Sequence, residues 1–350
     1  MFIYPPAYQI EEIQQLYIGR KKEGRIGLDI APMVEADTGQ VRWEQKDNYY
    51  GLQQMRGMDG APTRVVSVGR QVFSYDPGVY GEYDSPSEME LTNRSQGVSS
   101  NVPIDISDLV FERMDMLMTR AFDRIEYNIW TTLINGTISI VIGDPVTGKQ
   151  YGYTDTYVTQ TVTGTSWGGS PSTATPIQNF QTVQQLGVGY SVDLGAGATA
   201  YMNGATAYNL LNNTNNNDFG GRRDMFGATL NNLNQVNDYF QAQNLAKIVV
   251  YDQGYYPTIG GNTTGAFTKF IPNGKVLIIG KRPGDVPVAQ YKMTKCAPNG
   301  YRPGMYSFYK DFNQGINCAK EVGKGLEIHH GHNGGMAVMY PSAVVTLTVI

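Results

Sequence analysis

Three short segments hold residues whose types and spacing could do chemistry, and the first is a partial phosphate-binding loop. Gly143, Gly148 and Lys149 match the start of the pattern G-x-x-x-x-G-K. Gln150 stands where the pattern needs a Ser or Thr to hold magnesium, and the residues after it alternate like a strand instead of starting a helix. We therefore interpret this segment as a hairpin turn between two strands and not as a nucleotide site.

The second segment resembles a dinucleotide-binding fingerprint. Gly195, Gly197 and Ala200 carry its spacing, but they precede a predicted strand, whereas the glycines of the fingerprint follow one. The acidic residue that would bind the ribose is also missing from the expected context. The sequence therefore predicts no cofactor at this segment, and no other segment predicts one.

The third segment holds the 3 histidines of the chain, His329, His330 and His332. Imidazoles bind zinc or nickel, but in a strand His330 and His332 face one side and His329 the other, so three ligands do not converge. We interpret the cluster as a polar hairpin tip with its turn at Asn333 and Gly334, and not as a metal site. A Ser-His-Asp or Cys-His arrangement would need the same histidines, and no nucleophile-elbow pattern accompanies them. The sequence therefore predicts no catalytic residue.

The composition indicates a chain rich in turns and strands whose surface is covered by other protein. Only 17% of the 350 residues are charged, while 41 are glycine and 24 are tyrosine, and tyrosine is favoured at protein interfaces. A net charge of -4 excludes the basic patch of a nucleic-acid reader. No apolar run has membrane-spanning length, and the first ten residues lack the features of a signal peptide. We therefore expect a cytosolic protein in which Cys296 and Cys318 stay reduced.

One long helix is the strongest structural prediction. It extends from Ser107 to Asn135, with Ser107 as N-cap and Gly136 as the C-terminal stop. At 1.5 Å per residue it would be about 43 Å long, which fits an elongated molecule. Apolar residues recur at steps of three and four: Val110, Met114, Leu117, Ala121, Ile125, Ile129 and Leu133, with Met118 and Phe122 beside them. We expect the other face to be polar, with Asp115, Arg120, Asp123, Arg124 and Glu126.

Before this helix the pattern predicts segments that need a partner surface. Residues 1–32 hold too little apolar sequence to fold alone, and we expect them to form an arm lying on another subunit. Residues 40–46 and 63–75 alternate like strands, and residues 51–62 between them are rich in Gly, Gln and Met. A projecting hairpin of this kind is marginal by itself in water, so it also needs a partner.

After the helix the pattern predicts strands and then a compact α/β domain. Strands are expected at 138–142 and 154–163, followed by a helix over 176–186. From residue 187 short strands and helices alternate: strands at 198–202, 247–251 and 275–280, and helices at 205–212 and 230–239. The end of the chain is again strand-rich, with residues 326–332 and 336–340 as the two strands of the histidine hairpin. The fold class is α+β.

The order of these elements resembles the tailed-bacteriophage major capsid proteins of the Hong Kong 97 fold, and most of all the lambda-like major capsid protein E family. The resemblance is carried by residues 26–39 (IGLDIAPMVEADTG), the loop of Trp167, residues 246–256 (AKIVVYDQGYY) and residues 267–280 (FTKFIPNGKVLIIG). The last two segments are the strongest, because a strand, a turn region and then F-I-P-x-G-x-V-x-I look like what that branch has at the corresponding place.

The resemblance implies an N-terminal arm, an extended loop, a peripheral domain with a long spine helix and an axial α/β domain. The arm would be residues 1–32 and the extended loop residues 33–90. The peripheral domain would be residues 91–186, with its spine helix at 107–135, and the axial domain residues 187–285. Residues 286–350 would return to the peripheral domain, and the last strand would join the axial domain. It also implies inter-subunit contacts at Arg20, Arg25, Arg42, Trp43, Lys46, Met55 and Arg56, and it places Asn215 and Asn216 in a loop at the symmetry axis.

The function implied is a major capsid protein that assembles with itself into the hexamers and pentamers of an icosahedral phage head. It would enclose double-stranded DNA without sequence-specific contact. Its implied partners are a portal, a cement or decoration protein and, because the arm starts at Met1, a separate scaffolding protein; no membrane is involved, and assembly occurs in the host cytoplasm. An encapsulin-like nanocompartment and a tail or baseplate protein stay open as alternatives, and an enzyme is disfavoured because the three segments above lack complete sites.

Overall fold

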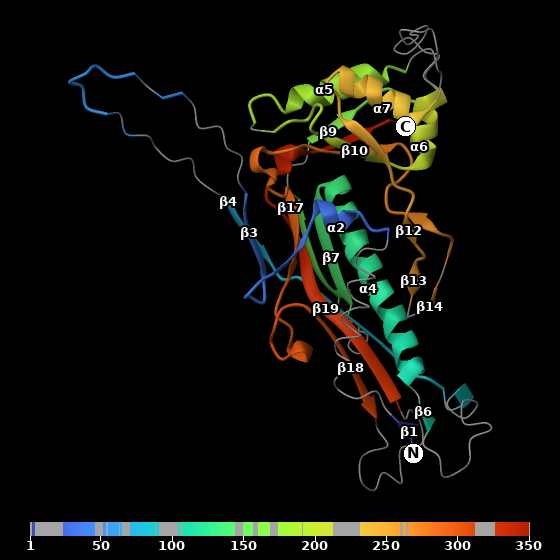
Figure 1. Ribbon diagram of the computed structural model, residues 1–350. Coiled ribbons are helices and arrows are strands. Elements are labelled where there is room, and N and C mark those ends of the chain that lie inside the picture. The colour runs from blue at the N-terminus through green and yellow to red at the C-terminus, as the bar shows by residue number, and fades with distance from the viewer. Residues whose placement is uncertain are drawn as a thin grey trace.

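The computed structural model describes residues 2–3, 24–45, 52–53, 55–62, 64, 71–87, 89–90, 104–105, 107–143, 150–156, 160–168, 174–190, 192–212, 232–259, 262–263, 265–311 and 326–349. Figure 1 shows an elongated subunit. A lower body is built along one long helix, an upper layer combines a sheet with shorter helices, and a loop projects to one side of both.

The lower body is organised by α4 (Ser107–Asn135), whose bounds agree with the predicted helix. Gly136 ends it at φ 65°, a left-handed conformation that suits glycine, and donates its N–H to the carbonyl of Thr132 at 3.0 Å. The predicted apolar stripe is buried at Val110, Met114, Leu117, Met118, Phe122, Ile125, Ile129 and Leu133. Ala121 is only half-buried, and the prediction that Glu126 lies on the polar face is wrong, because its side chain is fully buried.

A five-stranded sheet packs against α4, and its longest strand is β19 (Leu326–Val338). β19 pairs antiparallel with β18 (Met305–Asp311), β17 (Ala289–Met293) and β5 (Gly78–Asp84), and β17 pairs parallel with β2 (Met33–Glu35). The first hydrophobic core lies between this sheet and the helix.

The predicted hairpin turn at Asn333 and Gly334 is wrong, because β19 continues through both residues as one strand of 13 residues. Both residues are paired with β5, and Gly334 is also paired with β17. The glycines allow close packing: a Cβ on Gly334 would stand 2.8 Å from the carbonyl oxygen of Lys292, and a Cβ on Gly335 would collide with the hydroxyl of Tyr75. Strand pairing on both sides therefore overrides the local turn preference.

The upper layer contains the second five-stranded sheet and the second core. Its strand order is β11 (Lys247–Val250), β10 (Thr199–Met202), β16 (Lys275–Ile279), β20 (Val344–Thr348) and β9 (Gln160–Thr163). The helices α5 (Pro176–Leu186), α6 (Gly204–Asn212) and α7 (Leu233–Ala242) contribute to the same core. These elements match the predicted ones, although α7 begins later than residue 230 because Asn232 caps it by accepting from the backbone N–H of Gln235 at 2.9 Å. The division of the chain into domains stays a prediction.

Short strand pairs, all antiparallel except one, complete the described structure together with a short helix and three 3-10 turns. β3 (Val41–Gln45) pairs with β4 (Gln71–Tyr75) at the base of the projecting loop, and β7 (Thr137–Gly143) pairs with β8 (Gln150–Thr156) as the hairpin predicted in place of a phosphate-binding loop. The strand predicted over 154–163 is two strands, since β8 ends at Thr156 and β9 belongs to the upper sheet. The remaining elements are β1 (Phe2–Ile3) with β6 (Ile104–Asp105) as the parallel pair, β12 (Gly254–Tyr255) with β15 (Thr268–Lys269), β13 (Thr258–Ile259) with β14 (Asn262–Thr263), α2 (Gly27–Ile30), and the 3-10 turns Pro283–Asp285, Ala297–Asn299 and Pro341–Ala343. No helix in the described ranges combines the length and the hydropathy that a membrane crossing requires.

Candidate functional site

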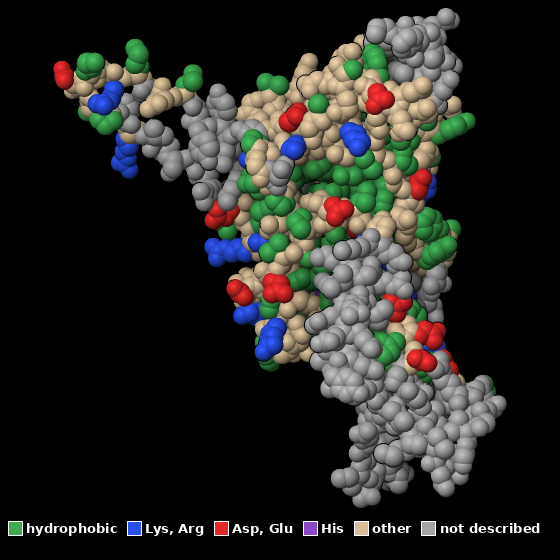
Figure 2. Space-filling view, in the orientation of Figure 1, with side chains coloured by type: hydrophobic (Ala, Val, Ile, Leu, Met, Phe, Trp, Pro, Cys, Tyr) green, Lys and Arg blue, Asp and Glu red, His purple; other side chains and the backbone are tan. Residues whose placement is uncertain are grey.

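The tip of the projecting loop presents the most exposed large apolar side chains among the described residues. Met55 and Met58 are 100% exposed and Leu52 is 94% exposed. Figure 2 shows hydrophobic side chains at the far end of the loop, with acidic and basic side chains beside them. Arg56 folds back and donates from Nη1 to the carbonyl oxygen of Gly60 at 2.8 Å. An apolar group held this far from any core indicates a surface that another molecule covers.

Trp43, which was expected at a subunit contact, instead lies inside its own subunit with 5% of its surface exposed. Its ring stacks on Phe73 at 5.3 Å between centroids and meets Tyr75 edge-on at 5.7 Å. The hydroxyl of Tyr75 donates to the carbonyl oxygen of Met336 in β19 at 2.8 Å. Trp43 therefore anchors the base of the loop on the lower sheet and leaves little surface for a neighbour.

The other expected contact residues are divided between the surface and the subunit interior. Arg42 is exposed, and its carbonyl oxygen accepts from Nζ of Lys292 at 2.6 Å. Arg25 forms an ion pair with Asp123 of α4 at 2.6 Å and its guanidinium lies 5.8 Å from the ring centroid of Phe122. Arg25 thus joins the residues just before α2 to α4 of the same chain. The other expected positions lie outside the described residues: Arg20, Lys46, Asn215 and Asn216.

A buried carboxylate, Glu126, joins three segments of the chain. Its Oε1 accepts from the backbone N–H of Gly27 at 2.8 Å, from Nε1 of Trp130 at 2.8 Å and from the hydroxyl of Tyr251 at 2.7 Å. Its Oε2 has no hydrogen-bond partner in the part of the chain that the structure describes. Burial is the largest influence on the Glu126 carboxyl and raises its pKa, while the three hydrogen bonds oppose that shift. A Cβ on Gly27 would collide with this carboxylate, so a larger residue there would displace it from its hydrogen bonds.

The sequence contained a signal for this residue. Glu126 follows Phe122 by four positions and precedes Trp130 by four, so the helical period places it inside the apolar stripe. A charged residue in such a stripe is buried only when hydrogen bonds compensate for its lost hydration. The three donors come from α4 itself, from α2 and from the residue after β11, and only the fold brings the last two to α4.

The histidines lie on opposite faces of β19 as predicted, but the prediction of a polar tip is wrong because His330 and His332 are 3% and 0% exposed. Nδ1 of His330 lies 2.6 Å from the hydroxyl of Ser307, and Nε2 of His332 lies 3.2 Å from that of Tyr291. Loss of hydration lowers the pKa of His330 to about 4 and that of His332 to about 3, so both rings are neutral at pH 7. His329 is on the other face, with Nε2 3.0 Å from the Glu327 carboxylate. In the described ranges no three His, Cys, Asp or Glu side chains are placed to hold a metal ion.

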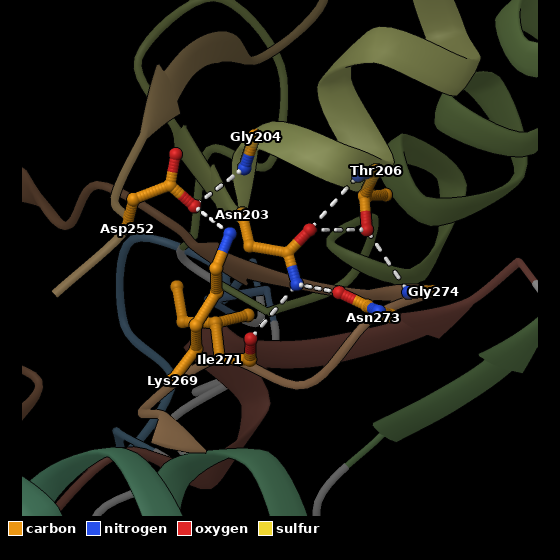
Figure 3. Close-up of polar contacts among 8 residues, drawn as sticks. All are labelled: Asn203, Gly204, Thr206, Asp252, Lys269, Ile271, Asn273 and Gly274. Atoms are coloured by element: carbon orange, nitrogen blue, oxygen red, sulfur yellow. Dashed lines mark hydrogen bonds and ion pairs between the residues drawn. The ribbon is translucent and has the colours of Figure 1, made fainter. Parts of the chain in front are cut away.

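A polar network connects the two segments that carried the resemblance most strongly (Figure 3). Oδ1 of Asn203 caps α6 by accepting from the backbone N–H and the hydroxyl of Thr206 at 2.8 and 2.9 Å. Nδ2 of Asn203 donates to the carbonyl of Ile271 at 3.0 Å and to Oδ1 of Asn273 at 2.7 Å. The F-I-P-N-G turn is therefore held against the start of α6 by an internal side chain.

Asp252 extends the same network at the surface. It accepts from the backbone N–H of Gly204 at 2.9 Å and from Nζ of Lys269 at 2.5 Å. These contacts, led by Lys269, hold the pKa of the Asp252 carboxyl below its usual range. Most of the contacts drawn in Figure 3 join residues far apart in the sequence, so the network fixes the backbone of these segments against one another.

Comparisons with known proteins connect this sequence and this fold to one protein family. A family model described as phage major capsid protein E matches residues 30–294 of the 350. The chain is similar in structure to a phage-related protein from Bordetella bronchiseptica RB50, with 11% identity, a TM-score of 0.55 and coverage of 96% of this chain and 95% of that one. It is also similar to a putative capsid protein of a prophage of E. coli CFT073, with 10% identity, a TM-score of 0.54 and coverage of 97% and 98%.

At these identities the two structures show the fold alone, which is the expected α+β viral capsid fold of the Hong Kong 97 type. A search of curated proteins finds no match. The family model covers the loop, the spine helix, the Asn203 network and most of the upper sheet, so the match extends over the parts described above. This chain therefore belongs to the phage major capsid protein E family and is a capsid shell protein.

Proposed function

We propose that copies of this chain assemble into the hexamers and pentamers of an icosahedral bacteriophage head that encloses double-stranded DNA. The observation that carries the proposal is the bare tip of the projecting loop, where Leu52, Met55 and Met58 are almost completely exposed. Covering each of these side chains would contribute about 1.5–3 kcal/mol. The same contact repeats at every subunit of a shell, so a modest gain per loop becomes a strong drive to assemble.

The shape of the subunit supports ring formation. In Figure 1 the loop leaves the subunit on one side, and α4 with β12 to β14 lies toward the other. A contact between two different faces of identical molecules is head-to-tail, and it closes into a ring when the rotation between copies is suitable. Rings of six and five are the units that a closed icosahedral shell needs.

The parts of the subunit take the following places in this proposal. Residues 1–32 form the arm, residues 33–90 the extended loop, residues 91–186 the peripheral domain, and residues 187–285 the axial domain with Asn215 and Asn216 near the axis. Residues 286–350 return to the peripheral domain, and their last strand, β20, pairs with β16 in the upper sheet. Arg42, Met55 and Arg56 on the described surface, and Arg20 and Lys46 beyond it, contact neighbouring subunits.

The proposed partners follow from the family. A separate scaffolding protein controls the shape of shells that the chain can close by itself in the host cytoplasm, a portal occupies one vertex, and a cement or decoration protein binds the finished shell. The DNA is enclosed without base reading, since a net charge of -4 provides no basic patch for it. The match to a phage capsid family favours this head over an encapsulin-like compartment and over a tail or baseplate protein.

Loop deletion tests the proposal. The chain and a variant in which a short Gly-Ser linker replaces residues 51–62 are each produced in bacteria, and their products are examined by electron microscopy and sedimentation. We expect closed shells from the chain, and folded subunits with unchanged far-ultraviolet circular dichroism but no shells from the variant. Tubes or monomers from the intact chain, or a normal yield of shells from the variant, would refute the proposal.

A further inference from the structure

A groove of about 630 Å³ lies between α4, the paired strands β5 and β19, and the segment that follows β12. Tyrosines form much of its wall: Tyr80, Tyr127, Tyr255 and Tyr256. The rings of Tyr127 and Tyr255 meet edge-on at 5.0 Å between centroids, and Tyr256 is 58% exposed. A wall of this kind offers aromatic surface to a flexible apolar side chain.

One positive charge in the groove is uncompensated. The carboxylate of Glu82 accepts from Nε of Arg120 at 2.6 Å, and that of Asp123 pairs with Arg25 at 2.6 Å. Arg124 is exposed and lies over the rings of two tyrosines, at 5.2 Å from Tyr80 and 5.1 Å from Tyr127. It forms no ion pair with any residue in the described ranges.

Two buried histidines also contribute to the wall of the groove. His330 and His332 both line it, and their Nε2 and Nδ1 atoms have no hydrogen-bond partner within the described structure. Both rings are neutral, so each of these nitrogens can donate or accept according to its tautomer. Both atoms are enclosed by the subunit itself, so they make this part of the wall polar but offer no direct contact to an incoming side chain.

The loop tip of the same chain has the complementary chemistry. Met58 is 100% exposed, and the carboxylate of Asp59 beside it is exposed without a described ion-pair partner. Arg56 donates to the carbonyl of Gly60 at 2.8 Å, and the N–H of Gly60 donates to the carbonyl of Gly57 at 3.0 Å. The turn is therefore formed before it meets any partner, which lowers the entropy lost on docking.

We propose that this groove receives the turn of residues 57–60 from a second copy of the chain. Met58 packs against the Tyr255 and Tyr256 wall, since thioethers make favourable contacts with aromatic rings. Asp59 pairs with Arg124, which supplies the missing negative charge and fixes the register of docking. In Figure 1 the loop leaves the subunit on one side, while α4 and β12, which contribute to the groove, lie toward the other, so a subunit does not fill its own groove. The inference rests on the proposed function, because it names the receiving surface of the assembling loop.

Charge reversal tests the pairing. Asp59→Arg and Arg124→Asp are each expected to lower the yield of shells about tenfold or more, because like charges across a contact cost several kcal/mol, and the double variant is expected to recover most of the yield. Gln53→Arg, which adds the same side chain to the loop away from the turn, is the matched control and should assemble normally. Normal shells from Asp59→Arg, or no recovery in the double variant, would overturn the inference.

Cross-linking tests the location independently of charge. Subunits carrying Met58→Cys are mixed with subunits carrying Tyr256→Cys, assembled and oxidised, and the covalent products are separated by denaturing electrophoresis. A disulfide dimer is expected for this mixture, but not when Val188→Cys, at a position 79% exposed in the upper layer, replaces Tyr256→Cys. The unchanged chain is oxidised in parallel because it contains Cys296 and Cys318. Shells without the disulfide would refute this groove and leave the proposed function intact, whereas failure of the unchanged chain to form shells would refute the proposed function.

Discussion

Replacing Glu126 perturbs the point where the end of the arm, the spine helix and the upper sheet meet. Oε1 of Glu126 is the acceptor for the Gly27 N–H, the Trp130 indole and the Tyr251 hydroxyl, at 2.7 to 2.8 Å. Glu126→Leu keeps a similar volume and removes the acceptor for all three donors. Glu126→Gln keeps a carbonyl oxygen in reach of the same donors and removes only the charge, so it is the matched control.

The magnitudes follow from the burial of this site. A buried donor without a partner costs about 1–3 kcal/mol, so three of them set a range of about 3–9 kcal/mol for Glu126→Leu. Because the site can relax and shift the Tyr251 hydroxyl, we expect a loss near the lower end, about 3–5 kcal/mol. Hydrogen bonds to a neutral amide are weaker than those to a carboxylate, but Glu126→Gln also avoids burying a charge. We therefore expect it to lose no more than about 1–2 kcal/mol.

The assay is urea unfolding of the unassembled subunit, followed by tryptophan fluorescence and far-ultraviolet circular dichroism. Trp130 stacks on Tyr251 at 5.1 Å between centroids, so its fluorescence reports on the junction itself. Equal losses in free energy of unfolding for the Leu and Gln variants would refute the reasoning, since the retained acceptor would then have no effect.

The pH dependence of unfolding, compared between the original chain and Glu126→Gln, provides a second test of the buried carboxyl. Burial raises the pKa of Glu126, so the folded chain holds this proton more tightly than the unfolded chain. The resulting stabilisation is present below the ordinary carboxyl pKa and is lost as the pH rises through the raised pKa. We expect the free energy of unfolding to fall over this range in the original chain relative to Glu126→Gln. A constant difference between the two across that range would show that the folded carboxyl has an ordinary pKa.

Three further predictions concern the loop base and the histidines. Gly335→Ala is expected to lose about 1–3 kcal/mol of unfolding free energy, because its Cβ would collide with a tyrosine hydroxyl, whereas Gly39→Ala, with open space around it, should change little; equal effects in urea unfolding would contradict this. Trp43→Ala should lower subunit stability by about 3–5 kcal/mol, while Met55→Ala should leave stability unchanged and reduce only shell yield, which sedimentation measures. The pKa of His332 is lowered to about 3 and that of His330 to about 4, so acidification below their ordinary pKa of about 6.5 protonates the unfolded chain first, and each ring costs up to about 1.4 kcal/mol per pH unit. In urea unfolding, His332→Gln should lower the slope between about pH 6.5 and 5 by the share of one ring and leave the share of His330.

The elements were predictable where local chemistry and tertiary packing agree. The C-terminal end of α4 follows from the left-handed position of Gly136, and its buried face follows from the helical period, whereas Ser107, expected as the N-cap, is the first residue of the helix itself. Pro176 and Leu186 likewise bound α5 as expected, with proline in the first turn. Such signals lie within a few residues of each other, so a single sequence contains them completely.

The errors arose where distant segments decide the outcome. The turn expected at Asn333 and Gly334 is part of a strand, because β5 and β17 supply the hydrogen bonds that a turn would have replaced. Trp43 is buried by Phe73 and Tyr75, which reach it only through the pairing of β3 with β4 and the contact of both with β19. In each case the local pattern was compatible with two environments, and partners remote in sequence select one of them.

The continuity of β19 has a consequence for assembly. The loop base is attached near one end of this strand, where Tyr75 donates to the carbonyl of Met336, and the groove is lined farther along it by His330 and His332. At about 3.3 Å per residue, Met336 is about 13 Å from His332 and about 20 Å from His330 along the same strand. A hairpin turn at Asn333 would have separated these two positions onto strands that could shift relative to each other. With one strand paired on both sides, the base of the loop and the groove keep a fixed spacing, and a ring of copies joined tip to groove closes only if that spacing is the same in every copy.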